Sequence, residues 1–340
     1  MPALPQARPR GWGVSGSGRF GLGEIGLLLA GVATSLAIAE GIARLSGAAD
    51  EKPTGYRPVR TGRRAAGPFN SRGHRDAERV IPKPAGVRRV VSLGDSFAYG
   101  VGVELDDTYA QRLERALNRR PGEQWEVVQL ARPGIGTVEE TEQLEQEGFA
   151  YQPDVVVLGF VLNDCEEMDA AHLRREREWL EAERAAQERG GLALWRLVRE
   201  RFSAALANRD RVANCLAEFA PHYPGWNMCQ KAMQRMGALC KQRAVPLVVM
   251  IFPLFENPLD DRYPFAAIHE QVAGLAGASG ATVLDLLPAY RGMRWEILVV
   301  NGPRDEHPNE IAHRIAARAL YGLLDKTILP RLPGAPSPGS

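Results

Sequence analysis

The sequence predicts an α/β fold, in which helical segments connect the strands of a central five-stranded parallel sheet and a helical insertion is added. Short apolar runs rich in β-branched residues recur along the chain, as in buried parallel strands. Segments with helical spacing of apolar residues lie between these runs, and this alternation is typical of parallel sheets built from right-handed crossovers. Glycine and polar residues follow several runs directly, where open α/β sheets bind their ligands.

The first expected strand is followed by a clear helical pattern. Tyr109, Leu113 and Leu117 fall on one face of a helix. The five expected strands are residues 89–93, 125–130, 154–159, 245–252 and 282–286.

Composition limits the class of protein. The chain has 340 residues, of which 45% are hydrophobic and 24% charged, enough for a packed core. Its formal net charge of +1 gives no reason to expect a nucleic-acid partner. Cys165, Cys215, Cys229 and Cys240 form no C-x-x-C pair, which argues against a zinc or redox site. The last three allow a disulfide in an oxidising compartment, and free buried thiols are the equal alternative.

The N-terminal region indicates membrane attachment. Residues 1–20 form a basic tail without acids, which we expect to be disordered. Residues 21–45 are apolar and rich in small side chains, and we expect a single-pass transmembrane anchor there, with the globular domain outside the cytoplasm. A cleaved signal peptide and a buried soluble helix are the alternatives. Arginines lie on both sides of the segment, so charge alone does not fix its orientation.

The remaining chain divides by composition. Residues 46–86 are polar with Gly, Pro and Arg and predict a linker, and residues 87–328 form the domain. Within it, about 165–230 is too long for one crossover and predicts a helical insertion, with a lid over the site as one interpretation. Residues 329–340 are rich in Pro, Gly and Ser and predict a disordered tail.

Ser96 is the candidate nucleophile. It stands two residues after Gly94, which breaks the first apolar run, so it is expected in a strand-to-helix turn. A backbone N–H near a helix N-terminus favours developing negative charge. Taken alone, Gly-Asp-Ser is more often an ordinary turn.

Two further strand ends carry groups that stabilise an oxyanion. Gly134 lies in a glycine-rich turn after residues 125–130, where the backbone can approach a ligand closely. Asn163 follows the run at 154–159, and its amide can donate a hydrogen bond. A plain loop and a helix cap are the respective alternatives.

His307 is the candidate base and Asp305 its partner. Both precede an amphipathic helix that contains Ile311 and Ile315. A carboxylate two residues away can accept from one imidazole nitrogen and leave the other facing Ser96. On its own, His307 would more often be a histidine of a surface loop.

The ordered set of these motifs resembles the SGNH hydrolases, also called the GDSL esterase/lipase family, across residues 68–326. The lead-in at residues 70–75 resembles that of membrane-anchored bacterial members. Arg304 stands where the family commonly has its acid, so Asp305 is assigned that role, and Val161 stands where glycine is frequent. The matching positions are the nucleophile block Gly94-Asp95-Ser96, then Gly134, Asn163, Asp305 and His307.

The resemblance implies the SGNH hydrolase fold, a three-layer, flavodoxin-like sandwich with helices on both faces of the sheet. It also implies an ester hydrolase without metal or cofactor. His307 takes the proton of Ser96, and Ser96 attacks an ester carbonyl. The N–H groups of Ser96 and Gly134 and the amide of Asn163 hold the oxyanion, and an acyl-Ser96 passes its acyl group to water. A small-molecule ester or an acylated carbohydrate is the expected substrate. Transfer of an O-acetyl group to an envelope polysaccharide and a catalytically silent carbohydrate-binding module are the alternatives.

Overall fold

The chain divides into two compact units. The smaller comprises residues 1–51 with 189–203, and the larger comprises residues 52–188 with 204–340. The computed structural model describes residues 22–45, 69–165, 211–300 and 306–333.

Helix α1, Leu22–Leu45, is the described part of the smaller unit. Its large apolar side chains between residues 27 and 42 are exposed rather than gathered on one buried face. Within the described stretches, no helix is both long and apolar enough to cross a membrane. The exposed side chains are those of Leu27, Leu28, Leu29, Val32, Leu36, Ile38 and Ile42.

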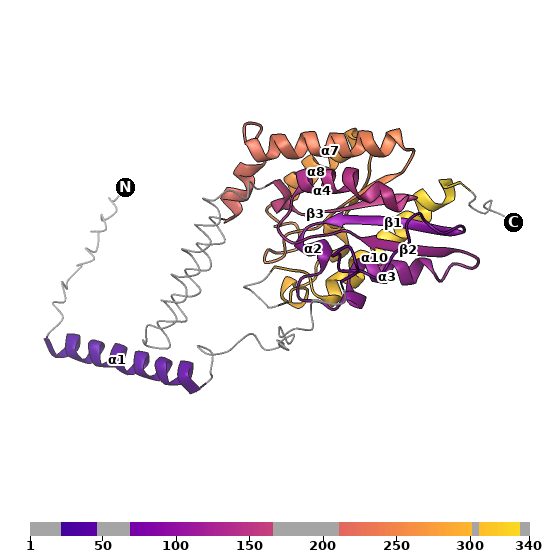
Figure 1. The fold of residues 1–340 in the computed structure, drawn as a ribbon. Coiled ribbons are helices and arrows are strands. Elements are labelled where there is room, and N and C mark those ends of the chain that lie inside the picture. Colours follow the sequence, from indigo (N-terminus) through magenta and orange to yellow (C-terminus); the bar gives the residue numbers. More distant parts are fainter. Residues whose placement is uncertain (1–21, 46–68, 166–210, 301–305, 334–340) are drawn as a thin grey trace, which may run out of the picture. The chain divides into compact units, whose positions relative to one another are not determined.

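A five-stranded parallel sheet forms the centre of the larger unit, in the order β2-β1-β3-β4-β5 (Figure 1). This is the predicted flavodoxin-like arrangement. All five predicted strands are confirmed, with their bounds shifted by a few residues. The strands are β1 Val87–Gly94, β2 Gln124–Gln129, β3 Val155–Phe160, β4 Leu247–Ile251 and β5 Thr282–Asp285.

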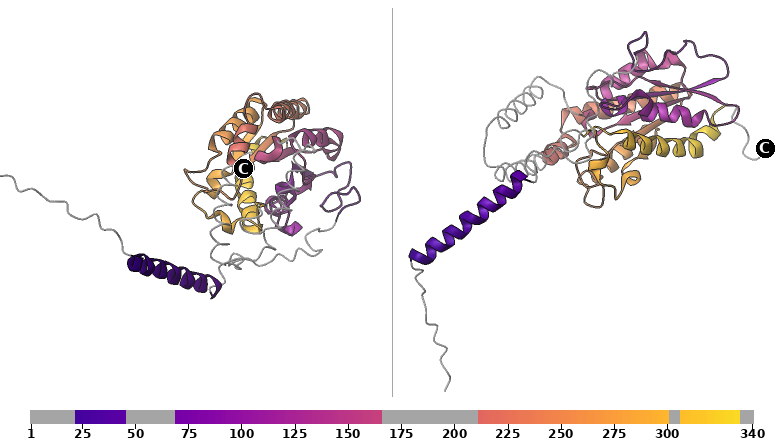
Figure 2. Two further views of the ribbon diagram at one scale, coloured as in Figure 1. Left: turned by 90° about the vertical axis from the view of Figure 1, so that its left-hand side faces the viewer. Right: turned by 90° about the horizontal axis from the view of Figure 1, so that it is seen from below.

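Helices cover both faces of the sheet and make the three predicted layers (Figures 1 and 2). Helices α3, Tyr109–Leu117, and α10, Glu310–Leu323, pack together on one face. Helices α4, Thr137–Gln146, α7, Pro224–Gln242, and α8, Ala266–Ala278, pack on the other. Because both faces are covered, every residue of the central strand β3 is buried, as its unbroken apolar run predicts.

His313 joins the two helices of the first face. Its Nδ1 accepts a hydrogen bond from the backbone N–H of Tyr109 at 3.1 Å, and the two rings stack. Burial lowers the pKa of His313 to about 3, so the imidazole is neutral. His313 is therefore a structural histidine of the core.

Both ends of the domain extend into segments whose composition predicts a linker or a tail. Residues 69–86 fall in the expected linker, yet Arg75 and Asp76 are buried in the domain. Leu329 and Leu332 fall in the expected C-terminal tail and are buried as well. The sequence prediction places the domain boundaries too far inward, because local sequence hardly distinguishes a polar linker from a polar segment that packs against the domain.

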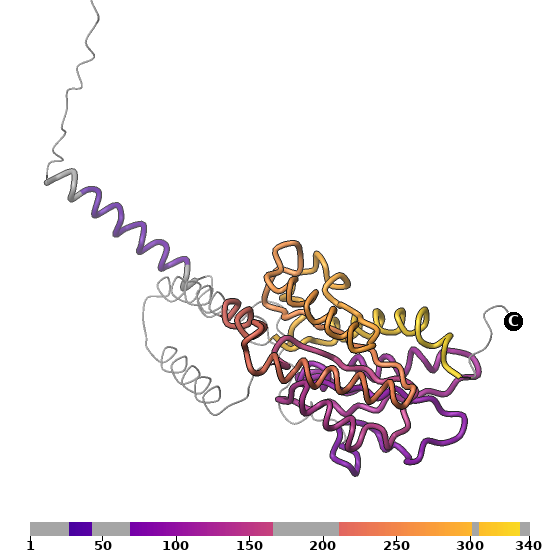
Figure 3. The backbone as a smooth tube through the Cα atoms, turned by 90° about the horizontal axis from the view of Figure 1, so that it is seen from above, coloured from indigo at the N-terminus to yellow at the C-terminus, as the bar shows by residue number. Residues whose placement is uncertain are grey.

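Only the last part of the expected insertion is described. Residues 166–210, including Trp195, lie outside the described residues, and residues 211–218 are helical. Helix α7 follows and is the long red-orange helix in Figure 3. Trp226 on this helix is buried against Phe219, with ring centroids 5.0 Å apart, so it belongs to the core. All four cysteines are buried and free, which agrees with the second of the two cysteine alternatives.

Candidate active site

Ser96 is the first residue of the short helix α2, Ser96–Tyr99, which begins directly after β1. Asp95 caps this helix, because its Oδ1 accepts the backbone N–H of Phe97 at 2.8 Å. The candidate nucleophile therefore lies in a strand-to-helix turn at the carboxyl end of a central strand, as predicted.

Gly94 allows this turn to lie close to the neighbouring strand. Its φ angle is +148°, a conformation that side chains rarely adopt. A Cβ atom at this position would clash with Ala98 and lie 2.9 Å from the carbonyl oxygen of Gly159. Glycine is thus required for α2 to pack against β3.

The carboxylate of Asp95 accepts three hydrogen bonds. Besides Phe97, the hydroxyl of Ser96 donates to Oδ2 at 3.2 Å, and the amide of Asn163 donates to the same oxygen at 3.4 Å. Burial raises the pKa of Asp95, while these hydrogen bonds and the nearby His307 oppose that rise. The candidate nucleophile and the candidate amide donor therefore meet at one carboxylate oxygen.

Asn163 lies in the 3-10 turn Leu162–Cys165 after β3. In this turn Oδ2 of Asp164 accepts the backbone N–H of Val161 at 2.9 Å. The Oδ1 atom of Asn163 is buried without a hydrogen-bond partner among the described residues, so Asn163 does not cap the turn. The side chain of Asn163 is consequently free to face Asp95. The structure thus excludes a helix cap, which was the alternative role for Asn163.

Gly134 is exposed in the loop between β2 and α4, with φ at +76°. The backbone N–H of Arg132 donates to the carbonyl of Gly94 at 3.0 Å and ties this loop to the end of β1. A Cβ atom on Gly136 would clash with the carbonyl oxygen of Asp164. The loop thus packs closely against the turns that carry Ser96 and Asn163.

His307 lies two residues before Asn309, the N-cap of α10. Its carbonyl accepts the N–H of Val300 at 3.0 Å, and the N–H of Asn309 donates to Leu298 at 2.8 Å. These paired backbone bonds fix the loop. The imidazole lies 5.5 Å from the ring of Phe97, measured between centroids, and therefore beside the residue that follows Ser96.

Asp305 lies outside the described residues, so its role as the acid stays a prediction. The neighbouring Glu306 shares Arg211 with Glu256: Nη1 of Arg211 lies 3.4 Å from Glu306 and 2.5 Å from Glu256. Burial raises the pKa of Glu306 to about 7, with Arg211 and His307 acting in the opposite direction. Local sequence gives no signal for this cluster, because its members come from three distant segments.

Arg75 is a positioning residue that the residue patterns did not assign. Its buried guanidinium donates to the carbonyl oxygens of Tyr99, Gly100 and Val103 at 2.8, 3.0 and 2.5 Å. It thereby holds the carboxyl end of α2, opposite to the Asp95 cap. The available signal is the lead-in motif at residues 70–75, which by itself indicates no role for Arg75.

No group of three or more His, Cys, Asp or Glu side chains in that part of the chain could hold a metal ion.

Comparison with known proteins places this geometry in a family. The model of the GDSL-like Lipase/Acylhydrolase family matches residues 92–315, while no curated protein matches. Among solved structures, TesA is 13% identical, with 70% of this chain and 98% of that chain covered and a TM-score of 0.46. The acetylxylan esterase Axe2 of Geobacillus stearothermophilus is 14% identical, with 68% and 92% covered and a TM-score of 0.45.

A putative lipolytic protein of the G-D-S-L family from Desulfitobacterium hafniense is 11% identical, with 69% and 99% covered and a TM-score of 0.43. Likenesses this distant carry no assignment of substrate. The family model is a stronger finding, because it spans most of the chain and includes Ser96, Gly134, Asn163 and His307. The chain therefore belongs to the GDSL-like lipase/acylhydrolase family and is an ester hydrolase.

Proposed function

We propose that this protein is a serine esterase that hydrolyses an O-acyl ester, with an O-acetyl group on a carbohydrate as the substrate, through an acyl-Ser96 intermediate. One observation carries the proposal: the hydroxyl of Ser96 and the amide of Asn163 converge on Asp95 at the end of β1. The contact between the rings of His307 and Phe97 supports His307 as the base.

In the proposed reaction, the hydroxyl of Ser96 turns from Asp95 to the imidazole of His307, which removes its proton. The Ser96 oxygen attacks the ester carbonyl, and the negative charge develops on the carbonyl oxygen. The N–H groups of Ser96 and Gly134 and the amide of Asn163 stabilise that charge. His307 then returns the proton to the leaving alcohol, and water hydrolyses the acyl-enzyme with His307 again as the base.

Asp305 is proposed to orient the imidazole by accepting from its second nitrogen. Glu306 is the competing carboxylate, because it adjoins His307 in sequence. Its hydrogen bond and ion pair with Arg211 and its pKa near 7 favour a different role, since a group that is half-protonated at neutral pH is a poor permanent partner for an imidazolium.

Water is proposed as the acyl acceptor rather than a sugar hydroxyl. Transfer to a sugar needs a surface that binds the acceptor and excludes water. The candidate contacts for an acceptor are Trp195, which lies outside the described residues, and Trp226, Leu254 and Phe255, which are buried in the core. This burial supports hydrolysis.

Labelling with a fluorophosphonate tests the nucleophile. The purified protein should be labelled and should hydrolyse 4-nitrophenyl acetate, whereas Ser96→Ala should do neither. Acyl donors supplied with and without glycans then separate the products. Acylated sugar in place of free acid would replace hydrolysis by transfer, and labelling of Ser96→Ala would refute the nucleophile.

Membrane attachment through residues 21–45, with the domain outside the cytoplasm, is also part of the proposal. The exposed apolar side chains of α1 support it, because such a surface needs a partner other than water. Full-length protein should fractionate with membranes, and a chain lacking residues 1–45 should be released in active form. A full-length protein that stays in the aqueous fraction without processing would refute this attachment.

A further inference from the structure

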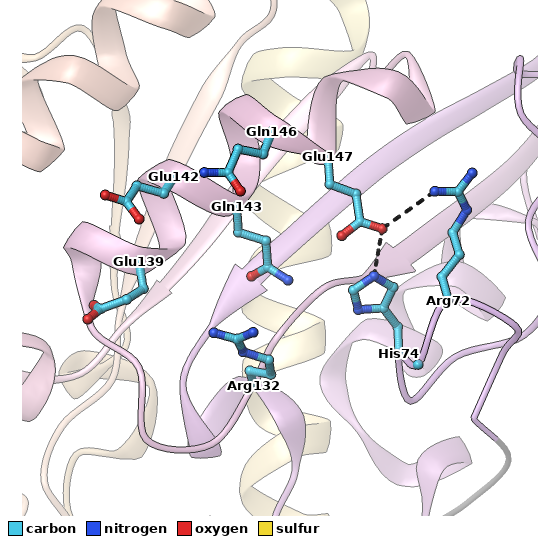
Figure 4. A pocket seen from close by; sticks show the side chains of 9 residues that line it. Arg72, His74, Arg132, Glu139, Glu142, Gln143, Gln146 and Glu147 are labelled. Atoms are coloured by element: carbon cyan, nitrogen blue, oxygen red, sulfur yellow. Dashed lines mark hydrogen bonds and ion pairs between the residues drawn. The ribbon is translucent and has the colours of Figure 1, made fainter.

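A polar pocket of about 360 Å³ lies between the turn at residues 72–74 and the outer surface of α4 (Figure 4). Figure 4 shows Glu142, Gln143 and Gln146 projecting from α4 on one side, with Arg132 and His74 on the other. The volume lies within the range of about 300–1,000 Å³ that is typical of small-ligand sites.

The walls of the pocket are fixed by hydrogen bonds. The Oδ1 atom of Asn70 accepts the backbone N–H groups of Arg72 and His74 at 3.1 and 3.0 Å, which shapes the turn. The Nε2 atom of His74 then bonds to Glu147 at 2.7 Å and joins the turn to the end of α4. The pocket is therefore built into the fold.

Several polar groups inside it have no partner of their own. The side chains of Arg132, Glu142 and Gln146 are exposed to solvent and make no hydrogen bond or ion pair to other described residues. The Oε1 atom of Gln143 is buried without a hydrogen-bond partner in the described part of the chain. A carbonyl oxygen that is buried without a hydrogen bond is unfavourable, because it has lost its contact with water. These groups are arranged for a ligand that both donates and accepts hydrogen bonds.

The side chains that line the pocket indicate which class of ligand it can bind. Guanidinium and carboxylate groups are both present, so the pocket lacks the excess of positive charge that a phosphate group would require. It has no aromatic or large aliphatic side chain to receive an acyl chain or a planar base. Planar amides, carboxylates and a guanidinium instead match the closely spaced hydroxyl groups of a sugar.

The pocket adjoins the candidate active site through Arg132. This residue is bonded through its backbone to Gly94 and stands two residues before Gly134 in the same loop. We infer that the pocket is a carbohydrate subsite, which binds a sugar residue of the substrate's alcohol portion while the ester is presented to Ser96. The role in presenting substrate rests on the proposed function, whereas sugar binding in the pocket does not.

Calorimetric binding of unacetylated oligosaccharides to the full chain tests this inference. The probes are β-1,4-linked xylose, mannose and N-acetylglucosamine oligomers, measured with the parent protein and with the double variant Glu142→Ala/Gln146→Ala. Both side chains are exposed, so the double variant should fold. Glu145→Ala is the matched control on the same helix, because Glu145 pairs with Arg235 instead of lining the pocket.

We expect at least one oligomer to bind the parent and the control equally, and the double variant to bind it about tenfold more weakly or worse. If no oligomer binds, or if the double variant binds like the parent, the inference is overturned, even where 4-nitrophenyl acetate is hydrolysed. Conversely, pocket-dependent sugar binding by a protein that hydrolyses no ester would refute the proposed function and leave the carbohydrate site in place.

Discussion

Replacing Arg75 by methionine should loosen the helix that carries Ser96. The substitution removes three charge-assisted hydrogen bonds, to the carbonyls of Tyr99, Gly100 and Val103, and keeps much of the apolar stem. Bonds of this kind contribute about 1.5–3 kcal/mol each.

The net loss should be smaller than three such bonds. The carbonyl of Tyr99 keeps a bond from Gln129, and that of Gly100 keeps one from the backbone N–H of Val103. Among the described residues, only the Val103 oxygen depends on Arg75 for its hydrogen bond. Removing the guanidinium also relieves the unfavourable burial that lowers the pKa of Arg75. We expect a loss of about 3 kcal/mol in the free energy of unfolding.

Urea denaturation and steady-state kinetics measure the two consequences. Arg75→Met should lower the midpoint of unfolding and reduce kcat for 4-nitrophenyl acetate by about tenfold or more, because Ser96 loses its fixed position. Arg75→Lys should recover part of both. Arg119→Met, at an exposed position, is the control. A loss below about 1 kcal/mol with unchanged kcat would refute the positioning role.

Three further predictions concern the active site and one core histidine. Ser96→Ala and His307→Ala should each lower kcat by about a thousandfold or more, with unchanged circular dichroism; near-parental rates would refute the assignment. Asp305→Asn should lower kcat strongly and Glu306→Gln only slightly, and the reverse order would transfer the orienting role to Glu306. His313→Asn should flatten the pH dependence of stability. The pKa of His313 is about 3 in the folded protein and about 6.5 for an ordinary histidine, as in the unfolded chain. As the pH falls, the unfolded chain therefore binds the proton before the folded protein does. Below pH 6.5 the free energy of unfolding of the parent therefore falls, and by pH 5 His313 has lowered it by about 2 kcal/mol relative to neutral pH. If the free energy of unfolding from urea titrations falls equally with pH in the variant and in the parent, this prediction is refuted.

Regular elements of this fold could be predicted because their signals are local. The run Val155–Phe160 is apolar throughout, and only a strand buried on both faces accommodates it. The position of Ser96 followed from the same logic, since a glycine and a polar residue at the end of such a strand predict the ligand-binding edge. The parallel direction of the strands follows from the helical segments between them, whereas their order in the sheet comes from the structure.

Contacts between distant polar segments could not be predicted in this way. Arg75 belongs to a segment whose composition indicates a linker, yet it is buried against α2. Arg211, Glu256 and Glu306 are brought together only by the tertiary structure. Trp226 illustrates the converse, because helical spacing alone does not tell a core tryptophan from one that faces a ligand.

The nucleophile turn depends on such distant contacts more than on its own sequence. Helix α2 has four residues, too few to be stable alone in water. A carboxylate, Asp95, holds its amino end and a guanidinium, Arg75, holds its carboxyl end, and each charge has the sign that complements the helix dipole. Both groups are buried, so their interactions are weakly screened by salt. The tripeptide Gly-Asp-Ser is a weak signal by itself for this reason: its geometry becomes that of an active site only when a second segment supplies the arginine.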